Sequence, residues 1–174
     1  MGTQIMGTTL PLQIRWMIRR DMPEVLDIEQ RCFAQCWSEE NFLCALRQRN
    51  TIGMIAEHQE AVIAFMVYQL KKAELHILNF AVHPQFWRSG VGSEMVAKLV
   101  AKLTSQRREK ISVCVREGNL PAQQFWRAVH FAAKNILSGY YEDTGEDAYR
   151  FVYTLGAKPE PHPLLRNRIS EFLK

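Results

Sequence analysis

Hydrophobic residues recur along the chain with two different spacings, and these spacings predict its helices and strands. A spacing of about three to four residues marks amphipathic helices, whereas short apolar runs between polar turns mark strands. We predict strands at residues 13–18, 51–57, 61–70, 75–82 and 111–115, and two more that surround residues 140–147. We predict helices that begin at Asp21, Ser38 and Pro121, and a long one directly after Gly92. The order β-α-α-β-β-β-α-β-α-β-β indicates a mixed α/β sheet.

The first two helices carry start signals and an apolar stripe. Asp21 is an acidic N-cap followed by Pro23 and Glu24, and Ser38 is the N-cap of the second helix. Helical spacing predicts that these two helices bury one face each, made of Val25, Ile28, Cys32, Phe33, Phe42, Leu43 and Leu46.

A glycine-containing turn joins the strand at 75–82 to the long helix. Gly90 and Gly92 let backbone amides approach an anion without interference from a Cβ atom. The helix N-terminus behind them offers unpaired N–H groups and the positive end of the helix dipole. The pattern predicts a phosphate or pyrophosphate cradle, although a tight turn between strand and helix would use glycines at the same positions.

Composition and charge narrow the class of protein. The chain has 174 residues with 22 Lys and Arg against 18 Asp and Glu, a balance that suits a polyanionic cofactor and also occurs without one. No apolar run approaches the length of about 20 residues that spans a bilayer, and we recognise no secretory signal. We therefore expect a cytoplasmic protein that engages neither membrane nor nucleic acid.

The four cysteines predict neither a metal site nor a disulfide framework. They form no Cys-x-x-Cys pair and have no matching histidine spacing, so we expect no bound metal. Three of them, Cys32, Cys36 and Cys44, occur at helical spacings among apolar residues, which predicts buried reduced thiols.

The length and the position of prolines and glycines suggest one domain with two appendages. Residues 1–12 are predicted to form a flexible arm, residues 13–155 the domain, and residues 156–174 a tail with a short basic helix. We expect this tail to pack on its own domain, and the sequence leaves monomer and homodimer open.

Several motifs resemble the GNAT acetyltransferases, in the order in which that family has them. Residues 88–93 resemble their acetyl-CoA pyrophosphate loop, residues 79–84 their fourth strand, and residues 115–119 their fifth strand and the asparagine after it. The segment Cys36-Trp37-Ser38-Glu39 and residues 140–148 resemble the branch that acetylates the N-terminal alanine of a ribosomal protein. The resemblance covers residues 14–155 and implies the GNAT fold, a single mixed central sheet with helices on both faces. It also implies acetyl-CoA as cosubstrate.

The resemblance assigns roles to particular residues. Backbone N–H groups of Phe80, Ala81 and Val82 would bind the acetyl carbonyl and the pantetheine arm. The pyrophosphate would lie on the amides of Arg88, Ser89, Gly90, Val91, Gly92 and Ser93. Asn119 would bind pantetheine or act only as a helix cap. Trp37, Tyr140 and Tyr141 would line the acceptor groove, the tyrosines having a sheet-edge aromatic pair as their alternative role.

The chain departs from the family at three positions. Trp87 replaces the usual Gln or Arg ahead of the loop, Cys114 the usual glutamate base, and Trp126 the usual tyrosine acid. We group Trp126 with the cofactor-binding residues, since an indole N–H is a donor but a very weak acid. His76, on the strand beside Cys114, is the best candidate base, and an idle histidine is an equally good interpretation. Cys114 and Tyr141 complete the candidate catalytic set, although Cys114 is more simply a packing residue.

Three functions remain open at this point. The first is transfer of acetyl from acetyl-CoA to the N-terminal α-amine of a protein or peptide, by direct attack in a ternary complex. The second is acetylation of a small amine such as a polyamine or amino-sugar, favoured by the acidic residues Glu142, Asp143, Glu146 and Asp147. The third is a catalytically weak acetyl-CoA-binding module, suggested by the replacements Cys114 and Trp126.

Overall fold

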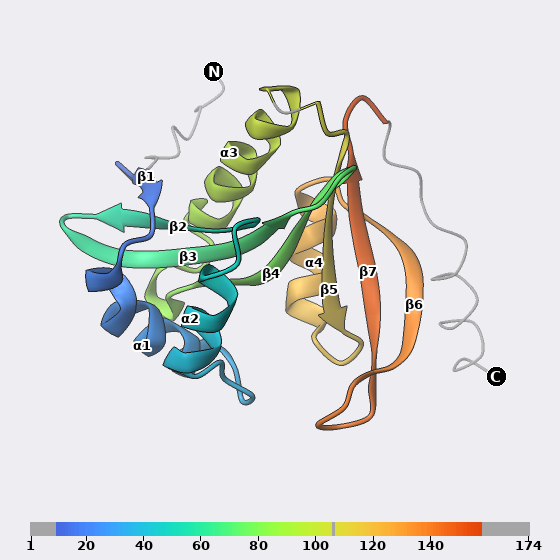
Figure 1. Cartoon of the computed structure of the whole chain (residues 1–174), viewed down its shortest axis with the longest axis horizontal. Helices are drawn as coiled ribbons and strands as arrows, with labels where there is room; N and C mark the ends of the chain where they lie inside the picture. Colours follow the sequence, from blue (N-terminus) through green and yellow to red (C-terminus); the bar gives the residue numbers. More distant parts are fainter. Residues whose placement is uncertain (1–9, 106, 158–174) are drawn as a thin grey trace, which may run out of the picture. The chain divides into compact units, whose positions relative to one another are not determined.

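The computed structural model describes residues 10–105 and 107–157, and the predicted order of helices and strands is confirmed there (Figure 1). The outer parts of the predicted arm and tail, residues 1–9 and 158–174, lie outside the described residues, and the domain boundaries stay a prediction. The strands are β1 Gln13–Trp16, β2 Thr51–His58, β3 Ala61–Leu70, β4 Glu74–Val82, β5 Lys110–Arg116, β6 Ala132–Tyr141 and β7 Glu146–Thr154. The helices are α1 Met22–Cys32, α2 Glu39–Leu46, α3 Val91–Ser105 and α4 Leu120–Ala128, with 3₁₀ turns at Arg19–Asp21 and Pro84–Phe86.

The strands form one mixed sheet of order β1-β2-β3-β4-β5-β7-β6, as the α/β prediction requires. Strands β4 and β5 pair in parallel, whereas β1 with β2, β2 with β3, β5 with β7 and β6 with β7 pair antiparallel. The described residues divide into two compact units, residues 10–70 with 78–99 and residues 71–77 with 100–105 and 107–157. Strand β4 therefore contributes its C-terminal part to the first unit and its N-terminal part to the second.

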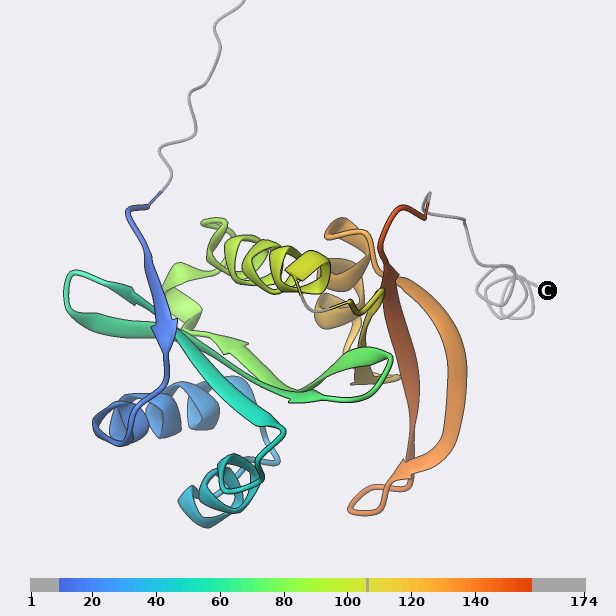
Figure 2. The same ribbon diagram turned by 45° about the horizontal axis from the view of Figure 1, so that its top comes forward.

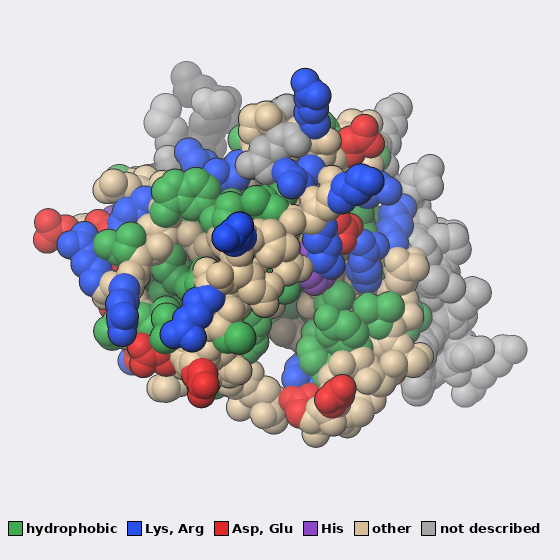
Figure 3. All heavy atoms as spheres, viewed as in Figure 1, with side chains coloured by type: hydrophobic (Ala, Val, Ile, Leu, Met, Phe, Trp, Pro, Cys, Tyr) green, Lys and Arg blue, Asp and Glu red, His purple; other side chains and the backbone are tan. Residues whose placement is uncertain are grey.

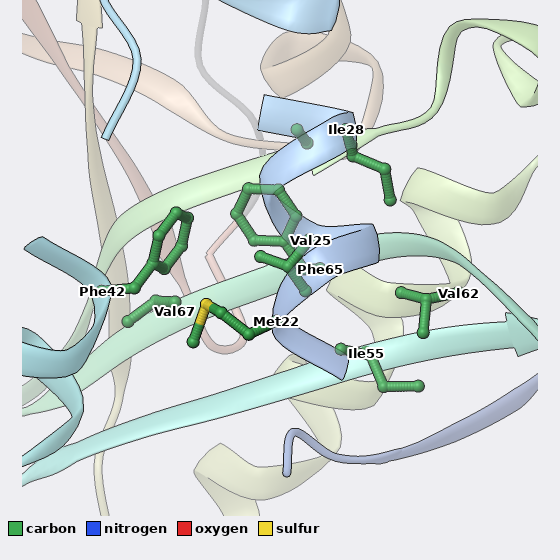
Figure 4. Close-up of a cluster of buried hydrophobic side chains, with 9 residues drawn as sticks. Met22, Val25, Ile28, Phe42, Ile55, Val62, Phe65 and Val67 are labelled. Atoms are coloured by element: carbon green, nitrogen blue, oxygen red, sulfur yellow. The ribbon is translucent and has the colours of Figure 1, made fainter. Parts of the chain in front are cut away.

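In the first unit, helices cover both faces of the strands. Figure 2 shows α1 and α2 on one face of β1–β3 and α3 on the other. The core under α1 and α2 is drawn in Figure 4, where side chains from both helices meet those of β2 and β3. This core consists of Met22, Val25, Ile28, Phe42, Ile55, Val62, Phe65, Val67 and Ala81. Leu43, Leu46, Cys32 and Phe33, which were also predicted to face inward, are only partly buried at its margin.

In the second unit, the pleat of β5 separates two environments. Ile111, Val113 and Val115 are buried, and Trp126 packs nearby with its ring centroid 4.8 Å from that of Phe131. The alternate positions Ser112, Cys114 and Arg116 face the other side of the strand, because successive side chains of a strand point to opposite faces. Polar groups of the unit lie on that second face, Ser112 and Arg116 of β5 among them.

The predicted cap of α1 is wrong in its chemistry. The Asp21 side chain makes no capping bond to the helix; it accepts from Arg15 at 2.8 Å and from the Ile18 N–H at 2.8 Å. The Arg15 guanidinium, which also pairs with Glu57, holds the pKa of Asp21 below its usual range. Ser38 does cap α2 as predicted, accepting from the Asn41 N–H at 3.2 Å.

No helix in the described part of the chain is long and apolar enough to cross a membrane. The expected cytoplasmic location stays a prediction.

We predict that Phe65→Ala destabilises the protein by about 3–5 kcal/mol, because Phe65 is fully buried and its loss leaves a cavity under α1 and α2. Leu120→Ala removes an apolar side chain that is 62% exposed and serves as the control, with a change within about 0.5 kcal/mol. Urea unfolding measures both, and equal midpoints for the two variants would contradict the packing described for this core.

Candidate functional site

The turn between β4 and α3 has the backbone that an anion cradle needs. Arg88 and Gly90 have positive φ angles of 64° and 89°, and α3 begins at the next residue, Val91. A Cβ atom built on Gly90 would meet no other atom within 4 Å, so the glycine is required by backbone conformation and the space above it is open. The N–H groups of the first turn of α3 have no partners inside the helix. The loop therefore fits an anionic group such as a pyrophosphate.

Trp87 is held beside the end of β4. Its indole Nε1–H donates to the Val82 carbonyl at 2.6 Å, while the side chain as a whole remains 58% exposed. The Cys32 thiol donates to the same carbonyl at 3.3 Å. Val82 is the last of the three β4 residues expected to face the thioester, so two donors fix the strand end that leads into the loop.

A buried carboxylate lies next to this strand. Glu29 of α1 is 1% exposed, and it accepts from the Trp37 N–H at 2.7 Å and from Asn79 Nδ2 of β4 at 3.0 Å. Burial raises the pKa of Glu29, and the two hydrogen bonds oppose that rise. The sequence prediction missed Glu29 and Asn79. The available signal was the position of Glu29, one turn after Val25 on the stripe predicted to face the core.

In the second unit, His76 is a neutral group in a polar contact. The parallel register sets His76 opposite Ser112, and His76 Nδ1 lies 2.8 Å from Ser112 Oγ. Burial, with a smaller contribution from the charge of Lys71, lowers the pKa of His76 to about 4. The imidazole is therefore unprotonated at neutral pH, but it is a much weaker base than an exposed histidine.

Cys114 lies in the same polar layer with both tyrosines predicted for the acceptor groove. Its thiol is hydrogen-bonded to Tyr140, and the Tyr141 hydroxyl donates to the Cys114 carbonyl at 3.3 Å. Burial raises the pKa of the Cys114 thiol and raises the pKa of Tyr141 to about 12. The structure thus brings three predicted residues together, all of them uncharged at neutral pH.

One arginine partly compensates the acidic turn between β6 and β7. Arg116 pairs with Asp143 at 2.7 Å and with Glu146 at 3.2 Å, and its guanidinium carbon lies 3.8 Å above the Tyr141 ring. Glu146 also accepts from the Gly118 N–H at 3.0 Å, and Asp147 accepts from the Gly139 N–H at 2.8 Å. Three of the four acidic side chains in this group therefore already have partners.

Basic groups accompany this layer as well. Arg150 of β7 stands opposite Cys114 in the sheet and pairs with Glu74 at 2.6 Å. Figure 3 shows Lys and Arg side chains gathered over the surface of this unit, beside a hydrophobic patch. Ser112 and Arg150, like Glu29, were not singled out from the sequence, because their partners are distant along the chain.

Two residues assigned to the cofactor have structural roles. Asn119 caps α4, its Oδ1 accepting from the Ala122 N–H at 3.2 Å, which is the alternative role left open for it. Trp126 is 3% exposed and packs between Phe125 and Phe131. That burial leaves the indole little surface to offer a cofactor, so we assign Trp126 to the core.

The prediction of buried thiols is wrong for two of the three helical cysteines. Cys36 and Cys44 are exposed, and Cys32 is partly buried. Cys36 lies in the segment after α1, where the chain has left the helix on which its spacing was read. Within the described residues no cluster of three or more His, Cys, Asp or Glu side chains could hold a metal ion.

Comparison with known proteins identifies a family and several similar relatives. The profile of the family described as "Acetyltransferase (GNAT) family" matches residues 22–131. The [ribosomal protein bS18]-alanine N-acetyltransferase of Escherichia coli K12 is 28% identical over 130 residues, covering 74% of this chain and 87% of the relative. An N-alpha-acetyltransferase of Sulfurisphaera tokodaii is 33% identical, covering 74% of this chain and 84% of that protein.

Solved structures confirm the predicted fold. The crystal structure of the E. coli ribosomal-protein-S18-alanine N-acetyltransferase has a TM-score of 0.75 and 25% identity, covering 87% of this chain and 99% of that one. Arabidopsis thaliana NAA60 in complex with acetyl-CoA has a TM-score of 0.73 at 17% identity, with 83% and 100% covered, and shows the fold alone.

We predict that iodoacetamide at neutral pH alkylates Cys36 and Cys44 well before Cys32 and Cys114. The thiols of Cys36 and Cys44 are exposed. Burial raises the pKa of Cys32 to about 11 and also raises the pKa of Cys114. These two thiols therefore have a smaller reactive thiolate fraction at neutral pH. Peptide mass spectrometry over a time course measures the order, and alkylation in urea, where all four should react alike, is the control. Labelling of Cys114 as fast as Cys44 would contradict the environment described here.

Proposed function

The chain belongs to the GNAT acetyltransferase family, and we propose that within this family it acetylates the N-terminal α-amine of a protein or peptide. Family membership makes it an acetyl-CoA-dependent N-acetyltransferase. The observation that carries the choice of acceptor is the aromatic pair Tyr140–Tyr141 beside an acidic turn in which Arg116 already pairs with Asp143 and Glu146. Such a surface suits an uncharged peptide backbone better than a polycation. The names of the two relatives, a [ribosomal protein bS18]-alanine N-acetyltransferase and an N-alpha-acetyltransferase, support the same choice.

Acetyl-CoA supplies an activated acetyl thioester, and we assign its pyrophosphate and acetyl group to residues of the first unit. The amides of residues 88–93 would hold the pyrophosphate, which fits the open, positive-φ turn at Gly90. Arg88, exposed on this turn, would replace the phosphate contact that Trp87 cannot make. The N–H groups of residues 80–82 would bind the acetyl carbonyl, where negative charge develops during attack. Asn119 can still donate its side-chain NH₂ to pantetheine while its oxygen caps α4.

Proton transfer in this proposal depends little on an enzyme base. An N-terminal amine has a pKa of about 7.7–8.0, so a sizeable fraction is neutral and ready to attack at neutral pH. His76, with a pKa of about 4, can accept a proton only weakly, and Cys114 stays a thiol. The raised pKa of Cys114 also supports direct attack by the amine over a covalent acetyl-cysteine. Tyr141, with a pKa of about 12, remains a hydroxyl donor in the catalytic set.

Acetylation assays on two acceptor panels test the proposed function. Peptides with free Ala, Ser or Met N-termini should gain one acetyl group by mass spectrometry, and the same peptides with blocked N-termini should gain none. Polyamines and amino-sugars should be poor acceptors. Preferential turnover of the small amines would instead support the alternative enzyme class, and CoA binding without turnover on either panel would support a binding module.

We predict that Gly90→Val weakens CoA binding at least tenfold while the protein stays folded. Valine at a φ of 89° strains the turn by about 1–2 kcal/mol, and its side chain would occupy the open space above the amides. Gly156→Val is the matched control, because Gly156 has a φ of 74° and equally open surroundings but lies after β7. Isothermal titration with CoA measures both, and unchanged affinity in folded Gly90→Val would refute the assigned loop.

We predict that kcat/KM for a peptide acceptor rises about tenfold per pH unit below the pKa of the acceptor amine and levels off above it. His76 is already neutral throughout this range, since its lowered pKa of about 4 places its protonation at more acidic pH. His76→Ala should therefore leave the pH at which the kcat/KM profile bends unchanged. Peptides whose α-amines differ in pKa should shift this inflection to the pKa of each amine. An inflection near pH 6.5 that disappears in His76→Ala would show that His76 titrates as the base.

A further inference from the structure

Glu29 is a buried charged group for which the reaction described above has no use. Its carboxylate is 1% exposed, and no Lys or Arg forms an ion pair with it among the described residues. A carboxylate removed from water is costly unless its oxygens are hydrogen-bonded. Here each oxygen has one donor, the Trp37 N–H and Asn79 Nδ2.

The two donors belong to segments that matter for the two substrates. Trp37, a candidate acceptor contact, lies in the connecting segment, which we define as residues 33–38 between α1 and α2. Asn79 directly precedes the three β4 residues assigned to the acetyl carbonyl and pantetheine. One side chain of α1 therefore joins the candidate acceptor segment to the candidate thioester strand.

Burial alone does not hold the connecting segment in place. Ala34, Gln35 and Cys36 are exposed, and the Cys36 thiol donates only to carbonyls of its own neighbourhood, Phe33 at 2.9 Å and Glu29 at 3.7 Å. The Trp37 ring packs edge-on against Phe42, 5.2 Å between centroids. The segment also donates a hydrogen bond to a side chain of α1, from the Trp37 N–H to Glu29, which is 2.7 Å long and charge-assisted.

We propose that Glu29 is a positioning residue for acceptor binding, whose carboxylate fixes Trp37 and the connecting segment relative to the end of β4. The inference rests on the proposed peptide acceptor. An apolar side chain would fill the same volume, but it would leave both donors unpaired and the segment free to shift. A glutamine keeps an oxygen for the Trp37 N–H, and its NH₂ group can donate to Asn79 once the Asn79 amide is flipped.

Kinetics of three variants test this role. Glu29→Met removes both acceptors at similar volume and should raise the peptide KM about tenfold or more, while the KM for acetyl-CoA stays within about twofold. Glu29→Gln should restore most of the peptide KM. Glu24→Met is the control on the same helix, since Glu24 also accepts a backbone N–H, from Val62 of β3 at 2.9 Å, but does not touch the connecting segment.

Amide hydrogen exchange provides a readout that needs no turnover. Exchange in residues 33–38 should be faster in Glu29→Met than in the wild type, and unchanged there in Glu24→Met. Unchanged exchange in folded Glu29→Met would overturn the positioning role whatever the acceptor is. Faster exchange with an unaltered peptide KM would overturn it as well. If the wild type acetylates small amines and no peptide, the proposed function fails and the acceptor role of Glu29 falls with it, while the exchange result still decides whether Glu29 fixes the segment.

Discussion

One carboxylate taken out of water constrains much of the first unit. Because Glu29 is buried on α1, β4 must present an amide at Asn79 and the chain after α1 must return with the Trp37 N–H. That return places Ser38 where it caps α2, and α2 then brings Phe42 onto Phe65 in the core. The far end of the same strand is fixed by two donors on the Val82 carbonyl before the chain enters the glycine turn. A few hydrogen bonds thus fix the positions of α1, the connecting segment, β4 and the glycine turn relative to one another.

The second unit uses charge differently. Its ionic groups are paired with one another, Glu74 with Arg150 and Arg116 with Asp143 and Glu146, and the candidate proton carriers His76, Cys114 and Tyr141 are neutral. Burial moves the pKa of each candidate proton carrier away from neutrality, downward for His76 and upward for Cys114 and Tyr141. A site of this kind can orient an acceptor by hydrogen bonds and aromatic contact, but it leaves deprotonation largely to the amine itself.

The elements of this fold could be predicted because each one buries a periodic stripe, and periodicity is local. The predicted strand 61–70 has the same bounds as β3. Strand β4 begins one residue before its predicted start, and β5 is one residue longer than predicted at each end. The sequence prediction failed where the role of a side chain depends on a partner elsewhere in the sequence. Asp21 was predicted to cap α1, but its carboxylate accepts hydrogen bonds from Arg15 and from the Ile18 N–H instead. Glu29 and Asn79 are 50 positions apart, and no spacing rule connects them. The glycine turn could be found from sequence because its conformation depends on its own residues.

The register of β5 explains why Cys114 cannot be judged as a simple loss of a glutamate. Residue 114 stands directly opposite Arg150, and Arg150 is already bound by Glu74 at 2.6 Å. A carboxylate at 114 would compete with Glu74 for this guanidinium, and the nearby positive charge would lower its pKa and weaken it as a base. A neutral thiol leaves the Glu74–Arg150 pair intact and keeps Tyr140 as a hydrogen-bond partner. The neutral thiol of Cys114 therefore coexists with the Glu74–Arg150 pair, whereas a carboxylate introduced at this position would share Arg150 with Glu74.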